Sequence, residues 1–484
     1  MAEHNSLPEK EDVEESPTPS GRLQAASDSP TEGDLEQILE PSDKAAPGNS
    51  EYIKQSTLET VGTRPPVLTR TITGRSNASS RRDPGPPPDG GLLAWTQAVM
   101  AHLVIFSTWG YISSFGLFQS YYEAALGVPP SNISWVGSVQ VFLLFFIGTF
   151  SGRALDAGFF HPVFISGVIL QLLGVFMTSL ATKYWQLFLA QGICNGIGGG
   201  LMFCPTMSLL STYFLRNRSM AIGIAASGTA TGGLVFPAIA RQLLPRVGFS
   251  WTVRVMGFVM LAINSLTISL LRTRLSPRKT GPIVEWTAFK ELTYSLYCLG
   301  MFLNFWGLYF AYYYVASFGR DIIGISSDDS MSLLLVMNGI GVLGRLVPGY
   351  FSDHTTGPLN MIIPFTFCSG IVLYAWSGVT TRSGLFAFAA FYGLISAGVQ
   401  GMFPAALSSL TTDMKKAGVR MGMGFSIVSF ACLTGPPLAG ALIQYGEGRY
   451  LYAQMFAGST LVCGGLTLVA ARIAKTGWNW KRRI

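Results

Sequence analysis

The stretch PPPDGGLLAW, residues 86–95, marks the point at which the chain changes character. Asp89-Gly90-Gly91 predicts a turn, because glycines tolerate backbone angles that other residues avoid. Trp95 follows where an indole ring is preferred, at the interface between a membrane and water. The mostly apolar run that continues to Gln119 is long enough to cross a hydrocarbon core of roughly 30 Å at about 1.5 Å per residue. The first membrane span is therefore expected to begin here.

The segment before this stretch is acidic and polar. Residues 1–60 hold fourteen acidic and four basic residues, and the sequence up to residue 85 is rich in Ser, Thr and Pro. Such a segment cannot bury enough apolar surface to offset the entropy lost on ordering. We therefore expect a disordered cytosolic tail over residues 1–87.

The chain after this stretch is apolar and poor in charge. Of the 484 residues, 49% are hydrophobic and 12% are charged, whereas a soluble protein carries about 25% charged residues. Residues 90–484 hold ten acidic and twenty-four basic residues, and the bases lie in short loops beside apolar runs. Bases in such places orient a membrane protein, and this interpretation is favoured over nucleic-acid binding. The six cysteines fall within apolar runs, which argues against a disulfide framework and a zinc site.

Twelve apolar runs follow one another and predict an all-α membrane protein with twelve transmembrane helices. The bases near the ends of these runs gather on one side, seventeen against seven. The positive-inside rule then places both termini and the central loop in the cytosol, with the plasma membrane as the expected location. The predicted spans are 93–119, 132–154, 161–181, 184–213, 218–243, 251–272, 292–318, 329–350, 358–379, 384–411, 419–445 and 450–473.

The chain repeats itself at a period of about 200 residues. The motif Gly200–Pro205 is echoed by Gly401–Pro404, and Gly152-Arg153 is echoed by Gly344-Arg345. Two pseudo-symmetric six-helix halves joined by a basic loop are typical of a parallel-repeat secondary transporter, whose substrate lies near the bilayer midplane between the halves. The expected divisions are the tail 1–87, an N-terminal half 88–272, a cytosolic central loop 273–291, a C-terminal half 292–475 and a basic cytosolic C-terminus 476–484.

Taken in order, the motifs of the chain resemble those of the major facilitator superfamily and, within it, the fungal form of the monocarboxylate transporter branch. The resemblance covers residues 88–475. It implies the major facilitator fold and a secondary transporter of a small organic solute that works by alternating access. It rests on Asp89–Trp95 at the entry of the first span, Gly152–Asp156 and Gly344–Asp353 at two cytosolic loops, Arg216–Pro237 around the fifth span and Gly435–Gly440 in the eleventh.

The chain also departs from this branch. Aligned on the entry motif, the lysine that the family carries late in its first span falls near Ser113. Aligned on Gly344-Arg345, the aspartate of its eighth span falls at Gly341. Arg345 retains the arginine of the family. The resemblance therefore implies a solute different from or larger than lactate, either monocarboxylate-like or an amphipathic or aromatic metabolite, with secondary-metabolite efflux as one candidate. Proton coupling and facilitated diffusion both stay open, and no cofactor is expected.

Ionisable residues within spans are the best indicators of a transport site, because burying them is costly. No Asp or Glu falls near the centre of a predicted span. His102 could titrate near neutral pH, either as a coupling residue or as a hydrogen-bonded structural histidine. Arg345 is the candidate partner for a carboxylate. Arg153 with Asp156 is one candidate gating pair and Arg345 with Asp353 is the other, with solvated anchor pairs as the alternative.

Aromatic and uncharged polar residues on several spans are further candidates for the substrate site. If they converge, they suit an amphipathic or aromatic solute better than a bare small anion. The alternative is ordinary helix–helix hydrogen bonding and an interfacial aromatic belt. The predicted substrate-binding residues are His102, Trp109, Ser113, Gln140, Asn195, Asn304, Trp306, Asn338, Arg345 and Gln400.

Two other classes of function fit the sequence less well. A polytopic membrane enzyme needs a catalytic cluster, and the chain contains no His-x-x-His or Gly-x-Ser-x-Gly motif. A nutrient sensor that signals through the long tail is the second alternative, and a nutrient or vitamin uptake permease is a variant of the preferred one. The preferred prediction is a transporter, not an enzyme, whose partners are a small organic solute, a proton if transport is coupled, and the lipid bilayer.

Overall fold

The computed structural model describes residues 85–128, 130–278, 281–479 and 482–484. The tail predicted over residues 1–87 lies outside these residues up to residue 84. Within the described ranges the chain is helical and contains no β-strand, which confirms the expected all-α fold. Long apolar runs form helices because a helix pairs its backbone N–H and C=O groups internally, as a lipid environment requires.

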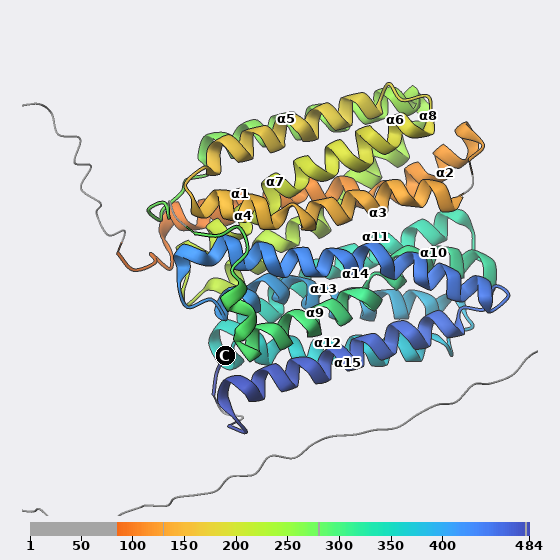
Figure 1. Ribbon diagram of the computed structural model, residues 1–484. Coiled ribbons are helices and arrows are strands. Elements are labelled where there is room, and N and C mark those ends of the chain that lie inside the picture. The colour runs from red at the N-terminus through yellow and green to blue at the C-terminus, as the bar shows by residue number, and fades with distance from the viewer. Residues whose placement is uncertain (1–84, 129, 279–280, 480–481) are drawn as a thin grey trace, which may run out of the picture. The chain divides into compact units, whose positions relative to one another are not determined.

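The N-terminal half extends from α1 to α8. In Figure 1 its helices form the upper group, coloured orange to green. Their bounds are α1 (Gly91–Ser113), α2 (Phe115–Leu126), α3 (Pro130–Phe146), α4 (Gly148–Asp156), α5 (Phe160–Thr178), α6 (Tyr184–Leu187), the π-helix η1 (Phe188–Cys194), α7 (Asn195–Tyr213) and α8 (Arg218–Leu270).

The C-terminal half extends from α9 to α15 and follows a connecting segment that contains a short 3-10 helix, η2. Its helices form the lower group in Figure 1, coloured green to blue. The bounds are η2 (Trp286–Lys290), α9 (Leu292–Leu308), α10 (Phe310–Phe318), η3 (Gly319–Ile323), α11 (Ser327–Phe351), η4 (Ser352–Thr356), α12 (Pro358–Trp376), α13 (Arg382–Ser409), η5 (Met414–Lys416), α14 (Ala417–Tyr445) and α15 (Leu451–Thr476).

The entry stretch forms the predicted turn and is tied to a distant part of the same half. Gly91 has a φ of 81°, which glycine adopts without the strain that a side chain would bring. The Asp89 carboxylate accepts hydrogen bonds from the backbone N–H groups of Leu215 and Arg216, the latter at 2.6 Å. Residues 85–90 are therefore fixed against the connection between α7 and α8.

The number of membrane spans agrees with the predicted twelve once two interrupted helices are considered. Ten helices within the described residues are long and apolar enough to cross a membrane. One of these, α8, is divided at Gly248, where φ is 74° and ψ is 175°. The predicted loop between spans 218–243 and 251–272 is therefore a sharp kink. The predicted span 292–318 is interrupted at Tyr309, which separates α9 from α10.

Glycines allow the first and fifth spans to pack closely. A Cβ atom on Gly228 of α8 would lie 2.2 Å from the carbonyl oxygen of His102 on α1. A Cβ atom on Gly232 would lie 2.6 Å from the carbonyl oxygen of Phe106. These glycines, four residues apart on one helical face, thus act in packing, as their spacing predicts.

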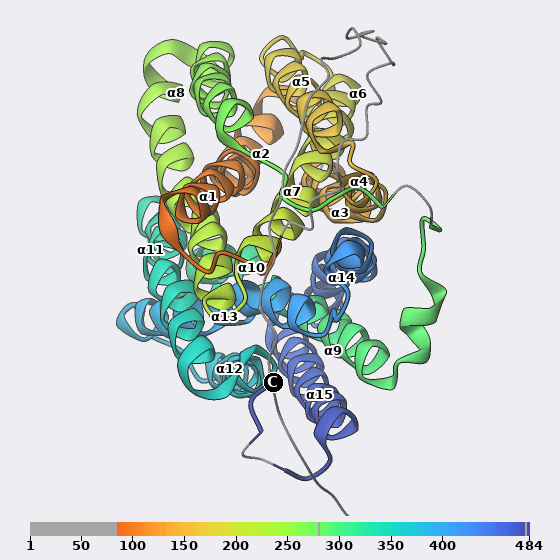
Figure 2. The same ribbon diagram turned by 90° about the vertical axis from the view of Figure 1, so that its left-hand side faces the viewer.

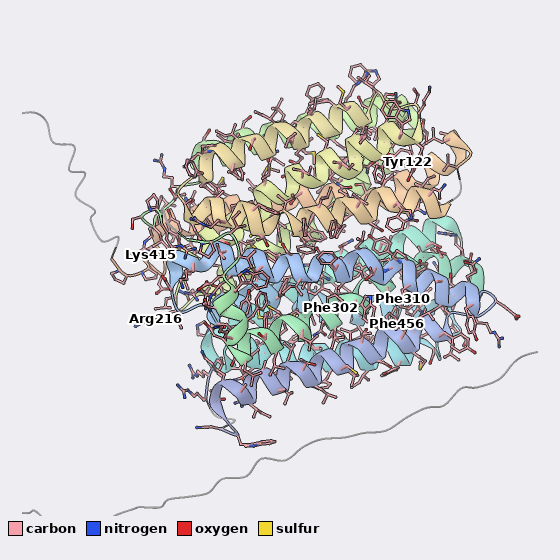
Figure 3. The ribbon with its side chains drawn as sticks, viewed as in Figure 1. Tyr122, Arg216, Phe302, Phe310, Lys415 and Phe456 are labelled. Atoms are coloured by element: carbon pink, nitrogen blue, oxygen red, sulfur yellow. The ribbon has the colours of Figure 1, made fainter. Side chains whose placement is uncertain are left out.

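The helices run between two ends of the bundle that differ in charge. Figure 2 views the helices along their axes, with the N-terminal half above the C-terminal half. Figure 3 shows Arg216 and Lys415 at one end, and Tyr122 toward the other. We call the end that carries Arg216 and Lys415 the basic end. The start of α1 and the described C-terminal residues also lie at this end (Figure 1).

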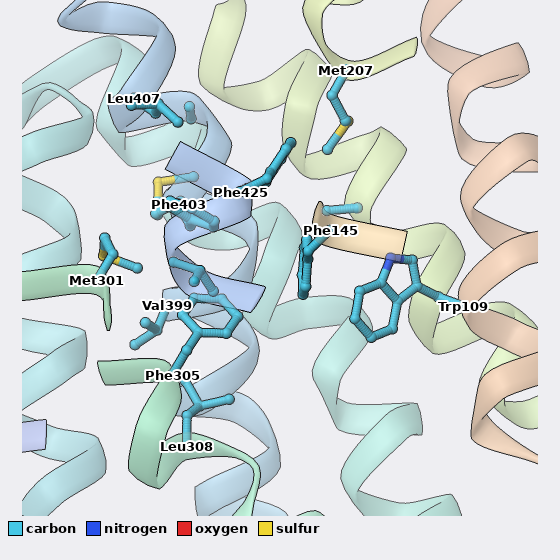
Figure 4. Packing of buried hydrophobic residues seen from close by; sticks show 14 of the residues in the cluster. Trp109, Phe145, Met207, Met301, Phe305, Leu308, Val399, Phe403, Leu407 and Phe425 are labelled. Atoms are coloured by element: carbon cyan, nitrogen blue, oxygen red, sulfur yellow. The ribbon is translucent and has the colours of Figure 1, made fainter. Parts of the chain in front are cut away.

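The largest buried cluster of hydrophobic residues includes side chains from both halves. Figure 4 shows Trp109 and Phe145 of the N-terminal half opposite Phe305, Phe403 and Phe425 of the C-terminal half. The ring centroids of Phe145 and Phe425 are 5.4 Å apart, which is a favourable separation for aromatic rings. The two halves therefore meet in an aromatic layer, and this layer surrounds the candidate site.

Candidate functional site

A small cavity lies between the two halves, inside the aromatic layer. Its volume is about 40 Å³. It is lined by α1, α3, α7 and α8 of the N-terminal half and by α9, α11, α13 and α14 of the C-terminal half, together with the junction of α9 and α10. The lining residues are Ile105, Trp109, Phe145, Phe203, Met207, Ala226, Thr229, Phe305, Tyr309, Arg345, Gln400, Phe403, Pro404 and Phe425.

Aromatic rings form most of the wall of this cavity. Trp109 and Tyr309, one from each half, lie parallel with ring centroids 6.3 Å apart and an interplanar angle of 16°. Phe145 and Phe203 pack against the other sides of Trp109, at centroid distances of 5.2 Å and 6.1 Å. Stacked and edge-on rings of this kind bind flat apolar groups through their faces. The wall is therefore suited to an aromatic or amphipathic solute.

Arg345 is the charged residue of the cavity wall. Its side chain is buried, and its guanidinium donates to the carbonyl oxygen of Gly341 at 3.1 Å and to Oε1 of Gln400 at 3.0 Å. Gln400 in turn donates from Nε2 to the Tyr312 hydroxyl at 3.4 Å. Among the residues that the structure describes, no carboxylate lies within ion-pair distance of Arg345. An anionic group in the cavity would supply the missing counter-charge.

The structure brings three of the predicted substrate-binding residues together at this cavity: Trp109, Arg345 and Gln400. His102 lies elsewhere, between α1 and α8. Its Nδ1 is 2.9 Å from the carbonyl oxygen of Ile224, and its Nε2 is 3.1 Å from the Thr231 hydroxyl. These partners agree with the structural alternative that the sequence left open for His102.

Ser113 is half-buried near the end of α1, outside the cavity wall. Its hydroxyl donates to the carbonyl oxygen of Trp109 at 2.9 Å. Asn338 on α11 faces α8, where its amide lies next to Gly233, and it donates to the carbonyl oxygen of Leu334 at 3.1 Å. Neither residue lines the cavity.

The other predicted polar residues are packed between helices of a single half. Asn304 lies against Gly464 of α15, and the Trp306 ring packs against Phe456 of the same helix. Gln140 and Asn195 are buried on α3 and α7. Each of these four residues has one polar atom for which the described part of the chain offers no hydrogen-bond partner: Gln140 Oε1, Asn195 Nδ2, Asn304 Oδ1 and Trp306 Nε1.

At the basic end, two aspartates connect the halves through helix N-termini. The carboxylate of Asp156, at the end of α4, accepts from the backbone N–H groups of Gly418 and Val419 on α14, both at 2.9 Å. The first turn of a helix leaves its N–H groups unpaired and carries a partial positive charge, so a carboxylate there is stabilising. This N–H pair belongs to the C-terminal half, so the contact joins the two halves at the basic end.

Asp353 makes the symmetry-related contact. Its carboxylate, on η4 of the C-terminal half, accepts from the N–H groups of Ser219 and Met220 on α8 at 2.9 Å and 2.7 Å. Both predicted gating aspartates thus accept hydrogen bonds from backbone N–H groups of the opposite half. Neither forms the predicted pair with its arginine. Arg345 lies in the cavity, away from Asp353. Arg153 donates to the carbonyl oxygens of Arg278 and Gly281 at 3.3 Å and 3.2 Å instead of pairing with Asp156.

The segment 281–291 before α9 adds a further link at the basic end. Glu285 is buried and accepts from Lys416 Nζ at 2.5 Å and from Arg420 Nε at 3.4 Å. Arg420 also pairs with Glu291. Burial alone would raise the pKa of Glu285, but the Lys416 hydrogen bond and the charges of Arg420 and Lys416 outweigh it and hold that pKa below its usual value. The segment is therefore bound to the start of α14.

Sequence reasoning missed two groups of residues. Phe203 and Phe403 of the cavity wall occupy equivalent places in the repeated motifs Gly200–Pro205 and Gly401–Pro404, so the repeat itself was a usable signal. Glu285 was missed because a single acid in a basic loop gives no indication of its partners. No group of His, Cys, Asp or Glu that could hold a metal ion occurs among the described residues.

Comparisons with known proteins agree with this architecture. The family model described as Major Facilitator Superfamily matches residues 100–419. An MFS-type transporter of Gibberella zeae is 45% identical over 87% of this chain and 96% of its own length. The aspyridones efflux protein of Emericella nidulans is 35% identical over 80% of this chain and 79% of its own length.

Solved structures show the same fold at low sequence identity. The human organic anion transporter MFSD10 (TETRAN) superposes with a TM-score of 0.62 at 13% identity, covering 78% of this chain and 98% of that protein. The Escherichia coli fucose:proton symporter FucP has a TM-score of 0.61 at 12% identity over 78% and 98%. This family is made of transporters, not enzymes. On its family match and its relatives, the chain belongs to the major facilitator superfamily.

Proposed function

We propose that this transporter moves a small amphipathic or aromatic organic solute that carries a carboxylate or a similar anionic group. The observation that carries the proposal is Arg345, a buried cation without a described acidic partner, in a wall of aromatic rings from both halves. The rings would bind the apolar part of the solute, and Arg345 with Gln400 would bind its anionic group. The retained arginine also supports placement in the monocarboxylate transporter-like branch.

We propose alternating access as the mechanism. The cavity of about 40 Å³ is too small for an organic solute, since ligand pockets measure about 300–1,000 Å³. The halves must therefore separate for the solute to enter. The Asp156 and Asp353 contacts close the basic end, so their release would open this end while the opposite end closes.

We propose that the basic end faces the cytosol and that the solute is exported through the plasma membrane. The excess of bases at this end supports the orientation through the positive-inside rule. The name of the aspyridones efflux protein, which describes export for that relative, supports export of a secondary metabolite here. Proton coupling would have to use a group other than a carboxylate of the cavity wall, because no Asp or Glu lines it.

The test is transport by the purified full chain in lipid vesicles. We expect an aromatic carboxylic acid to cross faster than its amide of the same size, by about tenfold, since a charge-assisted hydrogen bond contributes roughly 1.5–3 kcal/mol. Loading the solute on either side of oriented vesicles gives the direction. No flux above empty vesicles across organic acids, polyketide-like compounds and vitamins would contradict the proposal.

A further inference from the structure

A second cavity lies at the basic end of the C-terminal half, away from the aromatic layer. It is formed by the start of α12, the π-helix η4, the end of α15 and the segment 482–484. Its volume is about 510 Å³, much larger than that of the central cavity. The lining residues are Thr355, Thr356, Asn360, Ile363, Pro364, Arg472 and Arg483.

The chemistry of this wall favours an anion with an apolar extension. Two arginines and two threonines line the cavity, and none of its seven lining residues is acidic. Ile363 and Pro364 lie about one turn further along α12, on the side that leads away from the basic end. A phosphate group binds well to guanidinium and hydroxyl groups in this arrangement, and an acyl chain would continue along the apolar side.

The arginine at the base of the cavity is held in place by its neighbours. Only 1% of the Arg472 side-chain surface is exposed, and its Nε donates to Oδ1 of Asn360 at 2.6 Å. Its Nη2 donates to the carbonyl oxygen of Asn479 at 2.7 Å. Burying a cation costs free energy, and a fixed buried guanidinium is expected where a charged ligand is bound.

The second arginine reaches the cavity because the segment 482–484 folds across the start of α12. Asn360 donates from Nδ2 to the carbonyl oxygen of Arg482 at 3.0 Å, and the N–H of Leu359 donates to a carboxylate oxygen of Ile484, the last residue, at 2.8 Å. Gly357, with a φ of 84°, leaves room for this approach, since a Cβ atom there would lie 2.3 Å from Ile484. Arg483 is thereby placed at the rim.

The position of the cavity indicates where its ligand comes from. The helices α12 and α15 present exposed apolar side chains, such as Ile371 and Leu466, which are 61% and 58% exposed on these membrane-spanning helices. The cavity lies where both helices leave the apolar part of the bundle at the basic end. A lipid headgroup can reach such a place from the side, through the membrane.

We propose that this cavity binds the phosphate of an anionic phospholipid headgroup. The guanidinium groups of Arg472 and Arg483 pair with the phosphate, and the acyl chain lies along Ile363 and Pro364. The hydroxyls of Thr355 and Thr356, which now donate to the carbonyl oxygens of Phe351 and Gly357, turn to donate to the phosphate oxygens. Bound lipid joins α12 to α15 and stabilises the C-terminal half. This inference does not depend on which solute is transported.

The test is thermal unfolding of the purified full chain in detergent micelles, titrated with phosphatidylserine or phosphatidylcholine. We expect phosphatidylserine, whose headgroup has a net negative charge, to raise the unfolding midpoint with saturation. Phosphatidylcholine has the same phosphate, but its quaternary ammonium neutralises the headgroup and is repelled by the two arginines, so its effect should be much smaller. Arg483→Gln should weaken phosphatidylserine binding about fivefold, the effect of one basic residue on an anionic headgroup. The matched control is Lys475→Gln, which removes an exposed basic residue of the last turn of α15 that does not line the cavity.

Three results would overturn the proposal. Equal effects of the two lipids would show that the headgroup charge is not recognised. An equal loss with Lys475→Gln would show a general surface-charge effect. Inorganic phosphate that raises the midpoint as phosphatidylserine does would show a site for free phosphate.

Arg472→Gln should abolish the difference between the two lipids, and if this variant fails to fold, Arg483→Gln decides the question alone.

Discussion

Under the proposed function, Arg345 is the residue on which solute recognition depends most directly. Within the described residues the buried guanidinium donates to Gly341 and Gln400 and has no acidic partner. Burying it is costly, and an anionic solute would offset that cost. Arg345→Gln should raise the KM for an anionic solute by about 10- to 100-fold, the equivalent of roughly 1.5–3 kcal/mol, and leave a neutral analogue nearly unaffected. The measurement is initial flux in vesicles. The control is Arg382→Gln, which removes an exposed ion pair with Asp329. Equal losses for charged and neutral solutes would contradict the assignment.

Ser113 tests whether the later part of α1 lines the path. The residue lies one helical turn after Trp109 and is half-buried. Ser113→Lys would place a second cation near the aromatic wall, so we expect native transport to be abolished while the protein still folds. Ser113→Ala, which removes only the hydrogen bond to Trp109, is the matched control and should keep most of the flux. Unchanged flux in Ser113→Lys would move the path away from this part of α1.

At the scale of a single element, the segment 281–291 makes the free energy of unfolding depend on pH. The pKa of Glu285 is held below its usual value, so this group stabilises the folded state above its unfolded-state pKa, and that contribution is lost as the pH falls through the folded-state pKa. Glu285→Gln should lower the midpoint of thermal unfolding by a few degrees at pH 7. The difference from the unmodified chain should shrink as the pH falls below the usual glutamate pKa of about 4.3, and it should vanish below the folded-state pKa. Thermal unfolding across this pH range measures the effect.

The control for this prediction is an acid that makes no buried contact. Glu447 is exposed, and its Oε2 lies 3.9 Å from Nη2 of the exposed Arg449. Glu447→Gln should leave both the unfolding midpoint and its pH dependence nearly unchanged, since exposed ion pairs contribute little. A difference between Glu285→Gln and the unmodified chain that persists at acidic pH would show that the ion pairs to Lys416 and Arg420 are not its cause.

The helices were predictable where the local sequence pattern determines them. They were less predictable where contacts with residues distant in the sequence determine the structure. Apolar runs and their flanking bases predicted the membrane spans. The kink at Gly248 falls within residues 244–250, the predicted loop between two spans. The break at Tyr309 and the π-helix η1 over Phe188–Cys194 were not predicted. The contacts of Glu285 join residues more than one hundred positions apart, so no local pattern could predict them.

At the scale of the whole molecule, the internal repeat of the sequence predicted two helical halves with a substrate site between them. It could not predict which conformation the halves adopt. Asp156 and Asp353 each bind backbone N–H groups of the opposite half, and under the proposed mechanism these contacts break when the basic end opens. Three of the ten predicted substrate-binding residues lie at the cavity in this conformation.

The contacts between the halves at the basic end lead to a prediction about the proposed transport cycle. Ser219 of α8 and Ser352 of η4 belong to different halves, are buried, and have hydroxyl oxygens 3.0 Å apart. Replacing both by cysteine should allow a disulfide that locks this end, because the halves then cannot separate there. Oxidation should stop solute flux in vesicles, and a reductant should restore it. Each single replacement, oxidised in the same way, controls for the native cysteines, which are all free. Flux that continues through the oxidised double variant would show that the solute crosses without opening of the basic end, and alternating access between these halves would have to be given up.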